Sequence, residues 1–411
     1  MPTDQAMNEI QEAYVRALDV LRACSSPAGF LASPSDVDNY ARVWARDGVI
    51  TGLAALASGE PDLMITLRQT LTTLAHYQGP HGEIPSNVSV DGHKVSYGYL
   101  VGRVDTVLWY VVGVCAYLRS TRDADYKQEM RGSVERALFL AGCWEYNTRG
   151  LIYTPLSGNW ADEYVQQGYI LADQALYVLA LQNAGHVFER SAWSEKATVL
   201  RELLTLNYWP RSTLDTDPRI YHPHAYRAQA SRGEPTHWLP TFSPSGYTTT
   251  FDGLAHALAL LAAIGADDQR AKSDAYIEQL EHAIGSPLLP AFWPVIQPDD
   301  PAWTALEANH LYGQVKNQPY TYHNGGLWPM LTGLYAVGLT RYGCLQRAQH
   351  LLAALAAANA QGHAQSTWDF AEYHHGQTHE PMGTRHTAWS AAATILAHQV
   401  LTKGVQAWYV L

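Results

Sequence analysis

Two acidic residues stand out by their surroundings. Asp162 lies in the segment 158–163 (GNWADE), and Glu372 lies in the segment 368–376 (WDFAEYHHG). Both are close to aromatic residues and have no Lys or Arg beside them in the sequence. Burial against aromatic rings raises the pKa of a carboxyl group, and glycoside hydrolysis requires two carboxyl groups that flank the bond to be cleaved. Asp162 and Glu372 are therefore candidate catalytic carboxyls of a glycosidase.

Aromatic residues gather in the same irregular segments of the chain. Sugar rings present apolar faces and polar edges, so an aromatic wall with a few polar groups is typical of a carbohydrate site. The indole side chains in or beside these segments are Trp160, Trp209, Trp238, Trp293, Trp303 and Trp368. As a set they favour a site for a small carbohydrate over simple padding of the loops.

Histidine offers a second chemistry. The chain has 18 His, and five of them lie in or beside these segments: His323, His374, His375, His379 and His386. Two histidines on opposite faces of a sugar ring could act as acid and base in a sugar 2-epimerase or an aldose–ketose isomerase. A metal site made of His374, His375 and His379 lacks a partnered carboxylate pattern, and we expect neither a metal nor another cofactor.

The elements that must position these residues are mainly helices. Apolar residues recur at helical spacing over most of the chain, and sustained alternation of period two is scarce. About twelve helices of two alternating kinds are expected: a helix that is apolar all round must be buried, whereas one with a charged face lies at the surface. The expected surface helices are 4–24, 62–77, 123–146, 191–208, 267–284 and 344–361. The expected buried helices are 47–58, 104–120, 167–184, 248–264, 326–341 and 383–402.

The connections between the helices alternate as well. Each buried helix leads to the next surface helix by a short polar turn, and each surface helix leads onward by a long loop rich in Gly, Pro and aromatic residues. Antiparallel neighbours joined in this way place all the long loops at one end of the bundle. The pattern predicts an all-α fold, a double-layered (α/α)6 barrel of about twelve helices, with residues 1–411 as one domain. Asp162 and Glu372 precede the third and sixth buried helices and should face each other across its mouth.

Short motifs in the same order along the chain carry a family resemblance. Residues 43–51 (VWARDGVIT) and 103–109 (RVDTVLW) resemble the WxRD and VDxxLW elements of the alkaline/neutral invertases and of the glucosidase domain of glycogen debranching enzymes (amylo-α-1,6-glucosidase). Residues 159–162 and 173–177 resemble the WxD and ExxALWY pair of these proteins. Residues 319–329 resemble the YHNGGxWP motif of the invertases. Residues 371–376 and 387–390 resemble the PE(Y/I)xDG…QxWS terminus. Together the matches resemble the six-hairpin (α/α)-barrel glycosidases over almost the whole chain.

The resemblance implies roles for particular residues. Asp162 matches the general acid of these enzymes, and Glu372 matches the general base that activates water. Residues matched to the subsite of the attacked sugar ring, with neighbours in the same segments, are expected to hold its hydroxyls or to stack on it. These substrate-binding candidates are Trp44, Arg46, Asp47, Asp105, Trp160, Tyr322, His323, Asn324, Trp328 and Trp368. The enzymes are largely inverting and metal-free, and inversion places the two carboxyls roughly 6.5–9.5 Å apart.

The chain also departs from the family pattern. Asp173 stands where both groups usually have Glu, and His374 and His375 replace a more acidic stretch. Residues 214–244 match neither group well, and because such loops usually set specificity, the substrate is the part of the interpretation that stays most open. The extra N-terminal module of debranching enzymes is not seen in this sequence, which favours a short substrate over a glycogen particle.

Composition narrows the class further. The chain carries 27 Lys+Arg against 38 Asp+Glu, a net charge of -11, so a nucleic-acid partner is not expected. There is no apolar run of about 18 residues that would indicate a membrane span, and the N-terminus lacks the pattern of a signal peptide, so a cytoplasmic location is expected. Four scattered Cys without a CxxC pair indicate free thiols. The expected partner is a small carbohydrate, and the pattern allows either a monomer or an oligomer.

The sequence thus predicts an inverting exo-glycosidase of short α-glucosides, with sucrose as the first candidate and α-1,6-linked glucose as the second. Two alternatives stay open: a histidine-based sugar 2-epimerase or aldose–ketose isomerase, and a non-catalytic carbohydrate-binding barrel. Geometry distinguishes the three. A hydrolase needs two carboxyls with room for a water, an epimerase needs two facing histidines, and a binding barrel would have Asp162 or Glu372 blocked.

Overall fold

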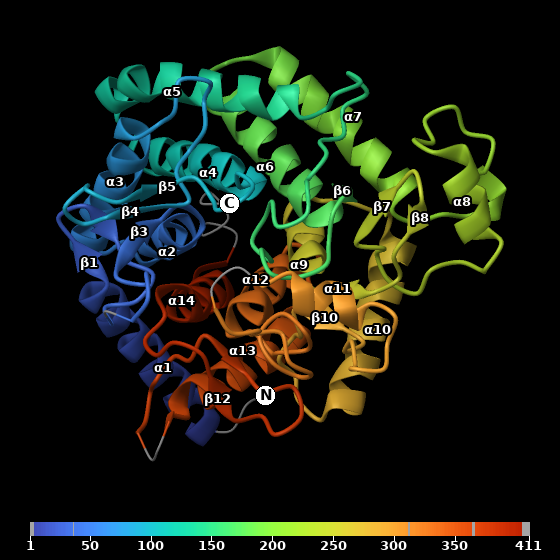
Figure 1. The fold of residues 1–411 in the computed structure, drawn as a ribbon. Coiled ribbons are helices and arrows are strands. Elements are labelled where there is room, and N and C mark those ends of the chain that lie inside the picture. The colour runs from blue at the N-terminus through green and yellow to red at the C-terminus, as the bar shows by residue number, and fades with distance from the viewer. Residues whose placement is uncertain (1–3, 36, 311–312, 364–365, 405–411) are drawn as a thin grey trace.

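The computed structural model describes residues 4–35, 37–310, 313–363 and 366–404. Twelve of the helices in this part of the chain alternate between an outer and an inner layer (Figure 1). The outer helices are α1 (Asp4–Ala23), α3 (Pro61–His76), α5 (Ala124–Cys143), α7 (Ser191–Asn207), α10 (Asp267–Ile284) and α13 (Leu345–Ala360). The inner helices are α2 (Ala45–Ser58), α4 (Val104–Thr121), α6 (Leu171–Val187), α9 (Gly253–Leu261), α12 (Pro329–Thr340) and α14 (Ala388–Lys403).

The inner helices form a closed ring. Each packs against the next along the chain, from α2 through α4, α6, α9 and α12 to α14, and α14 packs in turn against α2. The outer helices α3, α5, α7 and α13 each pack against the inner helix that precedes them, and α1 packs against α14. The closed ring and its outer layer confirm the predicted (α/α)6 barrel.

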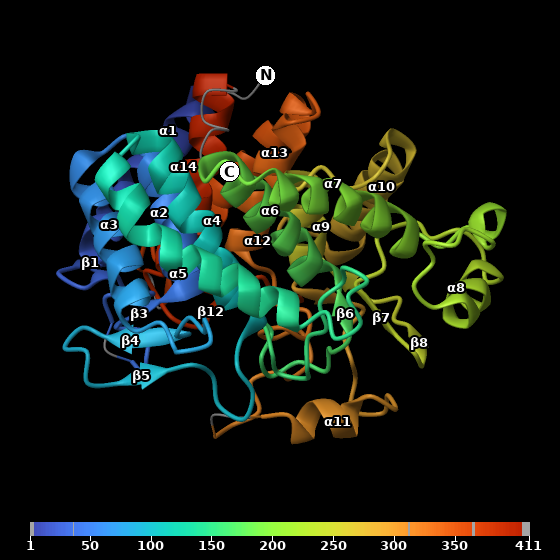
Figure 2. The same cartoon turned by 90° about the horizontal axis from the view of Figure 1, so that it is seen from above.

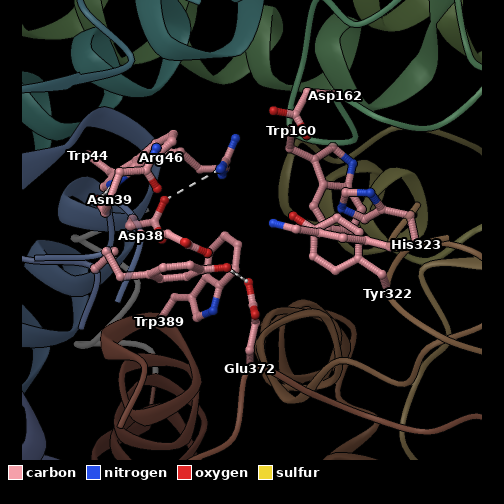
Figure 3. A pocket seen from close by; sticks show the side chains of 14 residues that line it. Asp38, Asn39, Trp44, Arg46, Trp160, Asp162, Tyr322, His323, Glu372 and Trp389 are labelled. Atoms are coloured by element: carbon pink, nitrogen blue, oxygen red, sulfur yellow. Dashed lines mark hydrogen bonds and ion pairs between the residues drawn. The ribbon is translucent and has the colours of Figure 1, made fainter. Parts of the chain in front are cut away.

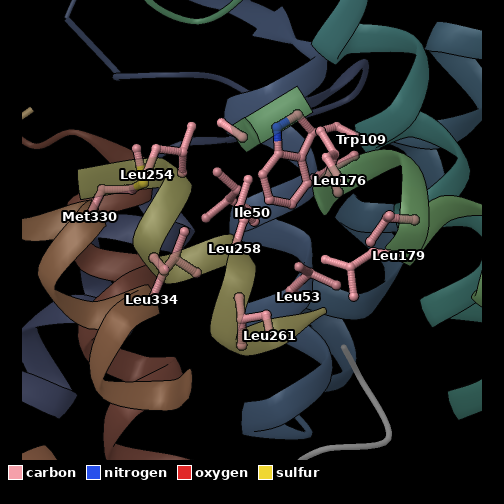
Figure 4. Close-up of a cluster of buried hydrophobic side chains, with 14 of the residues drawn as sticks. Ile50, Leu53, Trp109, Leu176, Leu179, Leu254, Leu258, Leu261, Met330 and Leu334 are labelled. Atoms are coloured by element: carbon pink, nitrogen blue, oxygen red, sulfur yellow. The ribbon is translucent and has the colours of Figure 1, made fainter. Parts of the chain in front are cut away.

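Burial follows the two kinds of helix that the sequence distinguishes. Every residue of α4 from Val104 to Leu118 is buried, whereas α10 buries Gln269, Ser273, Ile277 and Leu280, spaced by three or four positions along one face. Apolar side chains of five inner helices fill the space between them (Figure 4), namely Ile50, Leu53, Trp109, Leu176, Leu179, Leu254, Leu258, Leu261, Met330 and Leu334. No helix in the described ranges is both long and apolar enough to cross a membrane.

The long loops that lead into the inner helices hold short antiparallel strands. Figure 2 shows most of these strands, together with the loop helix α11 (Trp303–Ala308), gathered at one end of the barrel. A second loop helix, α8 (Pro223–Ala230), projects from the barrel (Figure 1), and the 3-10 turn η1 (Ser212–Leu214) precedes it in the same loop. The paired strands are β1 (Ser25–Ser26) with β2 (Gly29–Phe30); β3 (Arg42–Trp44), β4 (Asn87–Ser89) and β5 (Val95–Ser96); β6 (Tyr169–Ile170), β7 (Thr241–Ser243) and β8 (Gly246–Tyr247); β9 (Phe251–Asp252) with β10 (Phe292–Trp293); and β11 (Tyr373–His374) with β12 (Pro381–Met382).

Four inner helices begin later than the apolar pattern predicts. They start at Leu171, Gly253, Pro329 and Ala388 rather than at 167, 248, 326 and 383. The residue before each of them has an extended backbone; Trp328, for example, has φ −110° and ψ 115°, because a following proline disfavours the helical conformation. The apolar pattern therefore runs on into the extended residues before each of these helices.

Candidate active site

A cavity of about 200 Å³ lies where the long loops meet the starts of the inner helices. It is small beside the roughly 300–1,000 Å³ of typical drug-sized ligand sites, so it suits a small ligand. Four segments far apart in the chain form its wall (Figure 3): the segment that enters α2, the loop before α6, the loop before α12, and the loop before α14 together with the start of that helix. The lining residues are Ala32, Asp38, Asn39, Tyr40, Trp44, Arg46, Asp47, Trp160, Asp162, Lys316, Tyr322, His323, Glu372 and Trp389.

Asp162 lies on one side of the cavity and is held by an arginine. The Nη2 atom of Arg103 donates to Asp162 Oδ2 over 2.7 Å. The sequence suggested a carboxyl without a basic partner, and this was wrong, because Arg103 is remote in the chain and becomes a neighbour only in the fold. Burial still raises the pKa of Asp162, against the opposing charges of Arg103, Arg46 and Lys316. The Asp162 side chain keeps 15% of its surface exposed, so the carboxyl is not blocked.

Glu372 lies on the opposite side of the cavity from Asp162 (Figure 3). The Tyr40 hydroxyl donates to Glu372 Oε1 over 2.7 Å, and the Thr384 N–H donates to Glu372 Oε2 over 3.2 Å. Burial raises the pKa of Glu372, while the bonds from Tyr40 and Thr384 oppose this rise because they stabilise the ionised form. The two carboxyls thus share one cavity but have different partners.

A buried charge network lies between the starts of α2 and α4. Arg46 Nη1 donates to Asp105 Oδ2 over 3.1 Å, and Arg46 Nη2 lies 3.5 Å from Asp47 Oδ2. Arg46 and Asp47 line the cavity, whereas Asp105 lies behind Arg46 and does not line it. Burial raises the pKa of Asp47, and the charge of Arg46 opposes this. The guanidinium of Arg46 also lies over the Trp389 ring, 5.3 Å from its centre.

The aromatic wall has two layers. His323 lines the cavity and stacks on Trp328 with the ring centres 5.4 Å apart, while Trp160 meets His323 edge-on at 4.7 Å. Trp328 is fully buried behind His323. Burial lowers the pKa of His323 well below its usual value, with help from Arg46 and Lys316, so this imidazole is neutral. A neutral imidazole carries one donor and one acceptor.

The structure brings together eight of the residues singled out from the sequence. Those that line the cavity are Trp44, Arg46, Asp47, Trp160, Asp162, Tyr322, His323 and Glu372. Four others do not line it: Asp105, Asn324, Trp328 and Trp368. The Asn324 side chain is fully buried and bonds to the backbone of Ile296 instead. Trp368 stacks on Phe370.

Several cavity residues were missed from the sequence. Asp38, Asn39 and Tyr40 lie in the first predicted mouth loop but carry no motif, and Lys316 lies just before the YHNGG segment. Trp389 belongs to the C-terminal AWS motif, which could have identified it. Buried polar atoms of five lining residues have no hydrogen-bond partner within the described residues: Arg46 Nε, Asp47 Oδ2, Trp160 Nε1, His323 Nδ1 and Trp389 Nε1. Such atoms fit a ligand rich in hydroxyl groups.

The histidines do not converge as an epimerase or a metal site requires. Among the described residues that line the cavity, His323 is the one histidine. His374 Nδ1 lies 3.1 Å from the His379 carbonyl oxygen, and His379 Nε2 lies 3.1 Å from that of Ile284. In the described part of the chain, no group of three or more His, Cys, Asp or Glu side chains is arranged to hold a metal ion.

Gly383 allows the backbone to approach Glu372 closely. It has φ +73°, and a Cβ atom there would lie 2.4 Å from Glu372 Oε2 and 2.8 Å from its Cβ. We expect Gly383→Ala to lower the free energy of unfolding by roughly 1–3 kcal/mol, because both the left-handed backbone and the contact are unfavourable. Urea unfolding measures the loss. Gly343→Ala is the matched control, since Gly343 has φ +75° with no atom near its added Cβ; equal losses in both variants would contradict the contact with Glu372.

Comparison with known proteins gives relatives along most of the chain. A family model described as alkaline and neutral invertase matches residues 257–404. The probable alkaline/neutral invertase D of Arabidopsis thaliana is 23% identical over 450 residues, which cover 96% of this chain and 82% of that protein. Cytosolic invertase 1 of Oryza sativa subsp. japonica is 24% identical over 394 residues, covering 83% and 69%. Other relatives are named as chloroplastic or mitochondrial, so the cytoplasmic location stays a prediction.

Solved structures share the fold at lower sequence identity. A GH63 mannosylglycerate hydrolase from Thermus thermophilus in complex with Tris aligns with a TM-score of 0.61 and 14% identity, over 93% of this chain and 99% of that one. A bacterial glucoamylase complexed with acarbose aligns with a TM-score of 0.64 and 16% identity, over 95% of this chain and 55% of that one. These neighbours support the six-hairpin barrel.

Proposed function

We propose that this chain, a six-hairpin glycoside hydrolase related to the alkaline and neutral invertases, cleaves the glycosidic bond of a short α-glucoside with inversion at the anomeric carbon. Asp162 acts as the general acid and Glu372 as the general base. The observation that carries the proposal is the placement of two carboxyls, Glu372 buried and Asp162 partly buried, on opposite sides of one small cavity, each with its own hydrogen-bond partners.

The surroundings of Asp162 support a proton donor. Burial raises its pKa, so the carboxyl keeps its proton at higher pH than an exposed one does. Arg103 engages Oδ2, which leaves Oδ1 as the atom from which the proton passes to the leaving oxygen. Arg103 also stabilises the carboxylate that remains after this transfer. The same arginine therefore orients the acid and limits how far its pKa rises.

The surroundings of Glu372 support a proton acceptor. The bonds from Tyr40 and the Thr384 N–H favour the ionised carboxylate and fix its direction. An ionised Glu372 would take a proton from a water that attacks the anomeric carbon on the face opposite the leaving group. This requires the carboxyls to stand roughly 6.5–9.5 Å apart. The product sugar would form with inverted configuration.

The remaining lining residues suit one sugar ring. Arg46 and Asp47 offer a donor and an acceptor for ring hydroxyls, and His323 offers one of each. The indoles of Trp160 and Trp389 add N–H donors to the same wall. A small cavity that encloses a single ring fits an exo-acting enzyme, which removes one terminal sugar while the rest of the substrate lies toward solvent.

The substrate is proposed from the relatives. Their names as invertases make sucrose the first candidate, and α-1,6-linked glucose remains the second. The test incubates the protein with sucrose, isomaltose, maltose, trehalose and mannosylglycerate, with detection of released sugar and of epimerised sugar. Proton NMR of the first-formed anomer tests the stereochemistry. Release of the β-anomer from an α-glucoside is expected; a retained anomer, or epimerisation without hydrolysis, would contradict the mechanism.

Removal of the Tyr40 hydroxyl should change the pH dependence of the enzyme. Its bond lowers the pKa of Glu372, and hydrogen bonds to charged groups contribute about 1.5–3 kcal/mol, or roughly one to two pH units. In Tyr40→Phe the base would therefore lose its charge at higher pH, and the acidic limb of kcat/KM would move upward by up to that amount. Tyr146→Phe, which alters an exposed tyrosine outside the cavity, serves as the control. An unmoved acidic limb in Tyr40→Phe would argue against Glu372 as the base.

A further inference from the structure

The loop that carries Asp162 is closed at its base by backbone pairing. Thr154 and Gly168 exchange two hydrogen bonds, each N–H donating to the other residue's carbonyl oxygen over 2.8 Å. Between them the chain passes through Trp160 and Asp162 to the rim of the cavity. We name residues 154–168 the acid loop. Its closure fixes the two ends of the loop; near the middle, Arg103 holds the Asp162 carboxyl directly, and the backbone on either side of Asp162 needs supports of its own.

The buried carboxyl of Asp173 accepts hydrogen bonds from residues of the acid loop. Asp173 lies in the first turn of α6 and is only 2% exposed. Its Oδ2 atom accepts a bond from Thr154 Oγ1 over 2.7 Å and one from Asn159 Nδ2 over 3.2 Å. The amide oxygen of Asn159 in turn accepts from the N–H of Ala161 over 3.1 Å. Hydrogen bonds thus run from the inner helix to the residue directly before Asp162.

The acid loop is also held from its outer side. Asn317 Nδ2 donates to the carbonyl oxygen of Glu163 over 2.8 Å, and Ser157 Oγ donates to Asn309 Oδ1 over 3.0 Å. The residues on both sides of Asp162 are therefore held by hydrogen bonds, Ala161 through Asn159 and Asp173, and Glu163 through Asn317. Asp173 ties the acid loop to α6, the helix that follows the loop, and the N–H of Val104 at the start of α4 ties it to a second inner helix by donating to the Gly158 carbonyl oxygen over 2.7 Å.

We propose that Asp173 is a positioning residue for the general acid, which it acts on through Asn159 and the acid loop without lining the cavity. This inference rests on the proposed role of Asp162. Loss of the Asp173 carboxyl frees Asn159 and the turn it closes, so Asp162 no longer points its proton at the leaving oxygen. Misplacement of a catalytic group by about 1 Å can lower the rate a hundredfold.

The test compares leaving groups. Each variant is assayed on two substrates: the best glycoside of the panel, and the fluoride of the same sugar with the same anomeric configuration. Fluoride departs with little help from an acid. The variants are Asp173→Ala, Asp173→Asn and Asp162→Asn. We expect Asp173→Ala to lower kcat by about tenfold to a hundredfold on the glycoside, with KM little changed, and to lose far less on the fluoride. Asp173→Asn should recover most of the activity. Burial and the charge of Asp105 raise the pKa of Asp173 to about 8, so this carboxyl is mainly uncharged at neutral pH, and an amide oxygen still accepts both bonds.

Gln174→Ala is the matched control on the same helix. Gln174 is as deeply buried as Asp173, but its side chain bonds to the backbone of Ile152 rather than to the acid loop. We expect its loss of activity, if any, to be the same on both substrates. Equal losses on glycoside and fluoride in Asp173→Ala would overturn the positioning role, as would full activity of that variant. If Asp162→Asn itself shows no preference for the fluoride, the proposed acid fails, and this outcome is separate from a failure of Asp173 alone.

Discussion

Glu372→Gln is expected to lower kcat by roughly 10²- to 10⁴-fold, the contribution typical of a positioned general base. The amide keeps the size of the side chain and can still accept a bond from Tyr40, so folding and KM should stay near those of the wild type. What it loses is the charge that removes a proton from water. Steady-state kinetics on the best substrate of the panel measure kcat, and thermal unfolding checks the fold.

The control for Glu372→Gln makes the same chemical change outside the cavity. Glu380 follows on the same hairpin, is exposed, and does not line the cavity. Glu380→Gln should leave kcat unchanged. If Glu372→Gln turns over substrate at close to the wild-type rate, Glu372 is not the general base. The candidate bases would then be the remaining cavity carboxyls, Asp38 and Asp47.

The architecture could be predicted because each helix shows, in its own apolar and polar residues, whether it is buried on all sides or on one face. A helix such as α4 has no polar face over its buried length, and a helix such as α10 has only one apolar face. The alternation of the two kinds fixes the layers. The starts of α6, α9, α12 and α14 could not be predicted in the same way. Extended residues such as Ile170 and Trp328 are as apolar as the helices they precede, so periodicity did not separate them.

The sequence predicts which segments form the site, but it does not predict which of their residues line the cavity and which lie buried behind it. His323 and Trp328 belong to the same motif, yet His323 lines the cavity and Trp328 lies buried behind it. Hydrogen bonds between remote segments could not be predicted from the sequence. Tyr40 and Glu372 are 332 positions apart, and Arg103 and Asp162 are 59 positions apart. Such partners are fixed by closure of the helical ring, which brings the first and last loops of the chain together.

Asp162→Asn is expected to have an effect of similar size and to change the shape of the pH profile. An acid must be protonated to act, so activity falls as pH rises through the pKa of Asp162, which burial raises. The base must be ionised, so activity falls as pH drops through the pKa of Glu372, which burial also raises. Once Glu372 is ionised, its negative charge favours retention of the proton on Asp162. Glu372 therefore loses its proton at lower pH than Asp162 does, as a base and an acid in this mechanism must.

In Asp162→Asn we therefore expect kcat on the glycoside to fall by roughly 10²- to 10⁴-fold, with the alkaline limb lost and the acidic limb kept. The amide oxygen can still accept the bond from Arg103, so the variant should fold and bind substrate. Asp299→Asn, an exposed position outside the cavity, is the control and should keep both limbs. If the alkaline limb persists in Asp162→Asn, it belongs to another group, and the two carboxyls would have to exchange roles or share them with a further residue of the cavity.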